Sequence, residues 1–140
     1  MEQIGAYEPA DFWEELHSGN GQIILDQGAF YILVSQEAVH IPPDYAAEMA
    51  QFLAMVGEFR VHYAGFFDPG FGHDAAGGGV SRGVLEVRCH EAPFVLEHGQ
   101  IVGRLIYERM RCRHSQIYGA GIASNYQGQW LKLSKHFKAA

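Results

Sequence analysis

Apolar residues occur along this chain in short runs that are separated by turn residues. The run over Ala29–Ser35 is continuously apolar, which is typical of a buried strand, and Phe59–Phe67 places its aromatic residues on one face. The predicted strands are Gln22–Leu25, Ala29–Ser35, Ala38–Ile41, Phe59–Phe67, Val84–Arg88, Phe94–Leu96 and Ile101–Arg109. Many short strands between turns favour an all-β sandwich or barrel-like fold.

Two short helices are expected beside these strands. Pro9-Ala10-Asp11 predicts a helix over Asp11–His17, and Pro42-Pro43-Asp44 predicts a helical turn over Tyr45–Phe52. The Gly-Gly-Gly run within His73–Ser81 indicates a mobile loop. The fold class predicted from the pattern is therefore all-β with short helices.

Composition limits the kind of protein. A length of 140 residues fits a single domain, 1–140, and 48% hydrophobic with 19% charged residues excludes a disordered chain. No apolar run approaches the ~20 residues of a membrane span, and the first residues lack the features of a signal peptide. These features predict that the protein has no membrane partner. Two cysteines are too few for a disulfide framework, so we expect a reduced, cytoplasmic protein. A net charge of −6 argues against non-specific nucleic-acid binding.

The sequence gives only weak support for a serine nucleophile and for a zinc site. Gly79-Val80-Ser81-Arg82-Gly83 matches the letters of a nucleophile elbow, but a predicted strand follows where that motif needs a helix. The eight histidines and two cysteines show neither C-x-x-C nor H-E-x-x-H spacing, so no zinc site is predicted.

Glu86 is a stronger candidate for a catalytic residue than the serine, histidine and cysteine residues. Because strands have a period of two, Val84, Glu86 and Arg88 share one face of their strand. An exposed strand face is the ordinary interpretation of such a pattern. A carboxylate on a strand that follows a turn such as Asp68-Pro69-Gly70 is also a candidate general base, and both interpretations stay open at this point.

Four features in this order resemble the dCTP deaminase and dUTPase superfamily, and most closely the C-terminal half of tandem 2′-deoxycytidine 5′-triphosphate deaminases. They are Asp68-Pro69-Gly70, Leu85-Glu86, the Gly-Gln-x-x-Gly-x-Leu strand from Gly99 to Leu105, and a C-terminal Tyr118 followed by Asn125-Tyr126-Gln127-Gly128-Gln129 and Ser134. The resemblance covers nearly the whole chain from Phe30.

The resemblance implies a dUTPase-like β-clip and zinc-independent hydrolysis of dCTP to dUTP and ammonia. Glu86 would be the catalytic base, and Ala64, Asp68, Tyr118 and Gln129 would bind substrate. Mg²⁺ would be bound through the substrate triphosphate. Residues 111–140 would form a flexible C-terminal lid. A homo-oligomer would also be implied, either a trimer or a tandem-domain pseudo-oligomer.

The chain departs from the family pattern at its phosphate-binding positions. Where the family has Ser, Arg and Lys, this chain has Gln51, Met55 and Asn125, and Phe66 replaces a further Arg. One explanation is that another half of a tandem deaminase supplies the missing groups. The alternatives are a non-catalytic nucleotide-binding or structural half, and a dUTPase-type pyrophosphatase; Gly83 and Val84, where a dUTPase usually carries an Asp, favour deamination.

Overall fold

The computed structural model describes residues 3–51, 59–62, 66–77, 79–89, 93–121, 124 and 126–139. Its strands are β1 (Gln22–Leu25), β2 (Phe30–Val39), β3 (Tyr45–Gln51), β4 (Phe59–His62), β5 (Ser81–Cys89), β6 (Phe94–Glu97) and β7 (Gly103–Arg109). Two 3-10 helices, η1 (Pro9–Asp11) and η2 (Asp74–Ala76), are the helical elements of the described residues. The all-β class with short helices is thus confirmed.

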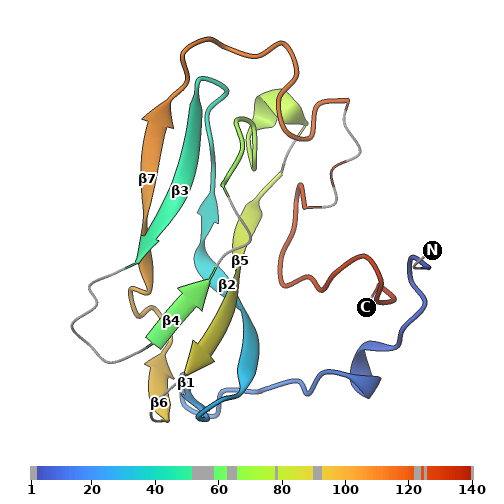
Figure 1. Cartoon of the computed structure of the whole chain (residues 1–140), viewed down its shortest axis with the longest axis vertical. Helices are drawn as coiled ribbons and strands as arrows, with labels where there is room; N and C mark the ends of the chain where they lie inside the picture. Colours follow the sequence, from blue (N-terminus) through green and yellow to red (C-terminus); the bar gives the residue numbers. More distant parts are fainter. Residues whose placement is uncertain are drawn as a thin grey trace.

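The strands form three small antiparallel groups rather than one large sheet (Figure 1). β2, β5 and β4 pair in that order, β1 pairs with β6, and β3 pairs with β7. The register of β2 against β5 shifts between Val34 and Ala38, so the two strands predicted on either side of this irregularity are one bent strand.

Strand β5 has one buried, inner face and one more exposed, outer face. Ser81, Gly83, Leu85, Val87 and Cys89 are buried, while the residues between them are half-buried or exposed. Leu85, Val87 and Cys89 join Leu25 and Met49 in one core cluster. A second cluster, made of Val39, Ile41, Ala47 and Phe71, lies under the Asp-Pro-Gly loop.

The helix predicted over Asp11–His17 is wrong. Only the single turn η1 forms, where the N–H groups of Phe12 and Trp13 both donate to the carbonyl of Pro9. Phe12 and Trp13 then pack edge-on against Phe137. A helix of so few residues is marginal on its own, and these aromatic contacts favour an extended chain.

The helical turn predicted over Tyr45–Phe52 is also wrong as far as Gln51; Phe52 lies outside the described residues. The N–H of Tyr45 donates to the carbonyl of Pro42 at 3.0 Å, so a turn does begin there. The chain then extends as β3 and pairs with β7 from Tyr45↔Arg109 to Gln51↔Gly103. Tertiary pairing overrides the local helix propensity.

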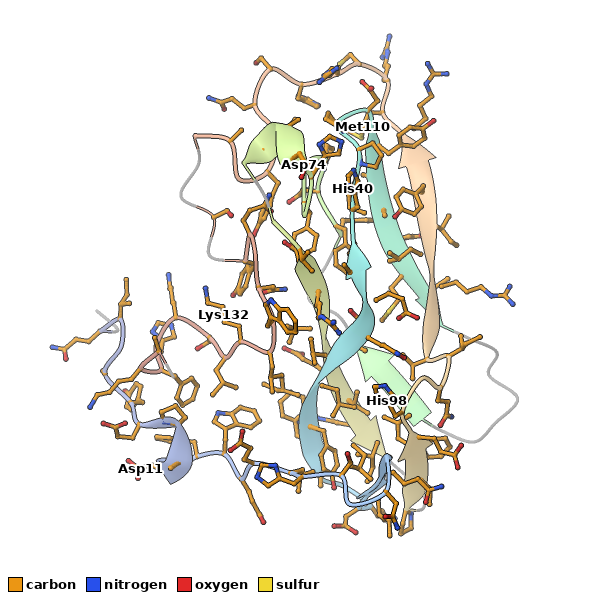
Figure 2. The ribbon with its side chains drawn as sticks, turned by 180° about the vertical axis from the view of Figure 1, so that it is seen from behind. Asp11, His40, Asp74, His98, Met110 and Lys132 are labelled. Atoms are coloured by element: carbon orange, nitrogen blue, oxygen red, sulfur yellow. The ribbon has the colours of Figure 1, made fainter. Side chains whose placement is uncertain are left out.

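The terminal segments lie side by side, apart from the paired strands (Figure 1). The N–H groups of Gly5 and Tyr7 donate to the carbonyls of Lys135 and His136, and the N–H of Lys138 donates to the carbonyl of Tyr7. The side chains of Lys138 and Glu8 form an ion pair. Figure 2 shows Asp11 and Lys132 on these segments, with His40, Asp74 and Met110 at one end of the strands and His98 at the other. No helix in the described part of the chain is long and apolar enough to cross a membrane.

Candidate active site

The loop that contains Asp68-Pro69-Gly70, called the Asp68 loop below, is held by main-chain hydrogen bonds on two sides. Phe67 and Ala47 exchange two hydrogen bonds, of 2.7 and 3.0 Å. The N–H of Gly70 donates to the carbonyl of Ile41, and the N–H of Ile41 donates to the carbonyl of Phe71. These bonds hold the loop between the end of β2 and the start of β3, and they leave Asp68 exposed at its tip.

Two glycines make this loop possible. Gly70 has φ +98° and Gly72 has φ +66°, both in the region that side chains disfavour. A Cβ on Gly72 would lie 2.0 Å from the carbonyl oxygen of Val39. The sequence Asp-Pro-Gly-Phe-Gly therefore encodes a close crossing of two backbones.

Glu86 lies on the outer, exposed face of β5, as the period-two pattern predicts. Its neighbours across the two ladders are Ile32 of β2 and His62 of β4. Within the described residues its carboxylate has no hydrogen-bond or ion-pair partner, and the nearby Arg88 stacks over Phe30 instead, 4.9 Å from the ring centroid. The carboxylate is therefore exposed to solvent.

The loop and the Glu86 strand are linked through Phe67. A Cβ on Gly83 would lie 3.6 Å from the ring atom Cζ of Phe67, so the ring packs over the glycine. Phe67 directly precedes Asp68, and Gly83 is three residues before Glu86. The Asp68 loop therefore packs on the buried face of β5, which is the face opposite to the Glu86 side chain.

Two predicted substrate contacts come from the C-terminal segment. The N–H of Tyr118 donates to the carbonyl of Pro69 at 2.8 Å, and its ring packs on Phe71 with centroids 5.7 Å apart. Gln129 is 9% exposed, and its Nε2 donates to the carbonyl of Arg82 on β5 at 3.0 Å. Tyr118 therefore adjoins the Asp68 loop, and Gln129 adjoins the strand of Glu86.

The remaining predicted positions are not all described. Ala64, Met55 and Asn125 lie outside the described residues, and for Gln51 only the main chain is described. Ser134 lies in the turn that meets the N-terminal segment, where its carbonyl accepts from the N–H of Phe137.

Ser81 is not an exposed nucleophile. It is fully buried, and its Oγ accepts a 2.8 Å hydrogen bond from the N–H of Gly128. The letters of the nucleophile elbow are therefore a chance match.

The sequence did not predict the contact between Gln127 and the Asp68 loop, or the pairing of Arg82 with Trp130. The Gln127 amide bonds to the main chain of Gly70 and Gly72, and the Arg82 guanidinium stacks on Trp130, 4.5 Å from the ring centroid. The partners are more than 45 residues apart in sequence, and no local pattern points to them.

Metal-binding side chains do not converge in the described part of the chain, where no group of three His, Cys, Asp or Glu residues could hold an ion. Both cysteines are free thiols. Burial raises the pKa of the Cys89 thiol, which disfavours the thiolate that reacts or binds metal.

Comparison with known proteins identifies relatives of this chain. The family model for the C-terminal domain of 2′-deoxycytidine 5′-triphosphate deaminase matches residues 1–137. The crystal structure of 2′-deoxycytidine 5′-triphosphate deaminase from Agrobacterium tumefaciens superimposes with a TM-score of 0.68 at 64% sequence identity.

That match covers 76% of this chain and 32% of the Agrobacterium chain, so the sequence spans about a third of that relative. A search of curated proteins finds no significant match. Because the family model extends over nearly the whole sequence, this chain belongs to the 2′-deoxycytidine 5′-triphosphate deaminase family, as a C-terminal domain of that family.

Proposed function

We propose that this domain contributes to the hydrolytic deamination of dCTP to dUTP and ammonia, with Glu86 as the general base. The observation that carries the proposal is the exposed Glu86 carboxylate on the outer face of β5, in a chain of the deaminase family. A carboxylate in this position can accept a proton from water and return it to a leaving group.

The reaction needs only a water molecule as co-reactant. Glu86 takes a proton from the water while the oxygen bonds to C4 of the cytosine ring and the C4=N3 π pair moves to N3. The same proton then goes to the 4-amino group. The N3 pair re-forms the C4=N3 bond as the bond from C4 to the amino nitrogen breaks and ammonia leaves. The C4 hydroxyl tautomer that results shifts its proton to N3, which gives the uracil ring. In this proposal the backbone carbonyl of Ala64 helps to hold the water.

The substrate contacts are assigned by position. Asp68 and Ala64 would shape the pyrimidine end, and Tyr118 and Gln129 would contact the sugar and triphosphate from the C-terminal segment. Mg²⁺ would be bound by phosphate oxygens of the substrate, since oxygen is the ligand it prefers. We propose residues 111–140 as the part that covers the bound nucleotide.

Partners and location are also proposals. A site assembled between β-clips would make the protein an oligomer, either a homotrimer or a tandem pair of domains. A cytoplasmic location would give access to free nucleotides. A non-catalytic half remains the second candidate, because the uncharged Gln51, Met55 and Asn125 occupy positions where the family has Ser, Arg and Lys.

Substitution of Glu86 by Gln tests the assignment of the base. Glu86→Gln keeps the shape of the side chain and removes its basicity. In a form of the protein that deaminates dCTP, with an N-terminal deaminase domain joined to this chain, we expect a fall in ammonia release of at least ~10²-fold. Glu108→Gln is the matched control, because Glu108 is an exposed glutamate on β7. Full activity in the Glu86 variant would exclude it as the base, and release of pyrophosphate instead of ammonia would indicate a dUTPase-type enzyme.

A further inference from the structure

The side chain of Gln127 forms a bridge to the loop that carries Asp68. Its Oε1 accepts a hydrogen bond from the N–H of Gly72, and its Nε2 donates one to the carbonyl of Gly70, each at 3.2 Å. An amide side chain offers an acceptor and two donors in one plane. Gln127 therefore pairs with the loop in the way that a neighbouring strand would.

A glycine makes room for this side chain. Gly119 has φ +90°, and a Cβ there would lie 2.9 Å from Cδ of Gln127. The neighbouring Tyr118 donates its N–H to the carbonyl of Pro69. Gln127 is thus seated between the turn at 118–119 and the loop at 70–72.

The residues after Gln127 attach the same segment to β5. The N–H of Gly128 donates to Oγ of Ser81 at 2.8 Å. Gln129 and Arg82 are joined by the bond from Gln129 Nε2 to the Arg82 carbonyl and by a 2.9 Å bond from the Arg82 N–H to the Gln129 carbonyl. In Figure 1 this segment is the red trace that descends next to the sheet. One short stretch of chain therefore contacts both the Asp68 loop and the strand of Glu86.

From this geometry we propose that Gln127 is a positioning residue for substrate binding. Its amide fixes the 70–72 backbone, and through it the exposed Asp68, when the C-terminal segment is docked. The proposal rests on the proposed function, because it assigns the loop to the pyrimidine end of dCTP. Gln127 touches no reacting atom in this arrangement, so its loss should weaken substrate binding more than the chemical step.

Hydrogen exchange measures the bridge without any need for activity. Gln127→Met keeps the length of the side chain and removes both hydrogen bonds. Gln127→Glu keeps the acceptor for Gly72 and places a carboxylate oxygen against the carbonyl of Gly70 in place of the donor. We expect the Gly72 amide to exchange roughly 30-fold faster in Gln127→Met, the factor for about two ordinary hydrogen bonds. Amides of β5 should keep their wild-type rates in both variants.

Kinetics then tests the link to substrate, in a protein in which an N-terminal deaminase domain is joined to this chain. The dCTP KM should rise by roughly tenfold in Gln127→Met, while kcat stays within about threefold of wild type. Gln22→Met is the matched control, since Gln22 donates to an exposed Glu97 on the β1–β6 pair. That variant should change neither quantity.

The outcomes separate this inference from the proposed function. Unchanged exchange at Gly72, or equal acceleration across the whole chain, would overturn the bridge. Faster exchange at Gly72 with an unaltered KM would overturn its role in binding. If Gly72 exchange rises in the variant but the wild-type chain joined to an N-terminal deaminase domain releases no ammonia, the deaminase assignment fails while the structural bridge stands.

Discussion

Single residues of the Asp-Pro-Gly-Phe-Gly loop set how closely β2 and the loop approach each other. The Gly72 backbone lies against the carbonyl of Val39, and its N–H is bonded by Gln127. Any side chain at Gly72 would have to move one of these backbones. The glycine is therefore a requirement of the tertiary contact as well as of the local turn.

Replacement of Gly72 by Ala should destabilise the protein in two ways. A positive φ costs a side-chain-bearing residue about 1–2 kcal/mol, and the clash with Val39 adds to it. Gly77→Ala is a matched control, because Gly77 has the same φ of +66° with nothing within 4 Å of a Cβ. Urea unfolding should give a lower free energy of unfolding for the Gly72 variant than for the Gly77 variant. Equal values would show that the Val39 contact relaxes freely.

At the scale of elements, β3 shows how pairing can override local preference. Tyr-Ala-Ala-Glu-Met-Ala-Gln contains good helix formers, yet Ala47 and Met49 are buried with a period of two. A strand forms because β7 offers a complete antiparallel partner and the core needs both side chains. The Asp-Pro-Gly loop depends on this strand, since Phe67 bonds to Ala47.

Truncation of Met49 tests the orientation of β3. Met49→Ala removes a side chain that is 9% exposed from the main core cluster, and we expect a loss of about 2–5 kcal/mol in the free energy of unfolding. Ile106→Ala, on the outer side of β7 at 45% exposure, should cost much less. Denaturant titration of both variants is the measurement. A larger decrease in the free energy of unfolding for Ile106→Ala than for Met49→Ala would contradict the assignment of Met49 to the buried face of the β3–β7 pair.

At the scale of the whole molecule, this chain lacks charged groups that the proposed triphosphate site would need. This chain spans 32% of its Agrobacterium relative, and a triphosphate needs several paired donors. Gln51, Met55 and Asn125 supply none of the charged groups that the family pattern places there. The tandem proposal assigns the missing Ser and Arg to another domain, across an interface.

The 140-residue chain alone should therefore bind dCTP weakly and turn it over slowly or not at all. Loss of two charge-assisted contacts of ~1.5–3 kcal/mol each corresponds to roughly two to four orders of magnitude in affinity. Titration calorimetry with dCTP and Mg²⁺ should show weak binding, restored when an N-terminal deaminase domain is joined to the chain. Micromolar affinity with ammonia release from the 140 residues alone would contradict the tandem proposal.

The sequence by itself determined the all-β class, the approximate positions of the core strands other than β3, the face of β5 that carries Glu86, and the family. These features are encoded locally, in apolar periodicity and in short motifs such as Asp68-Pro69-Gly70. The tertiary structure alone decided that Tyr45–Gln51 is a strand, that Ser81 is buried, and that Gln127 bonds to Gly70 and Gly72. Each of these depends on a partner far away in the chain, and the free energy of such a contact exists only after the fold has brought the two together.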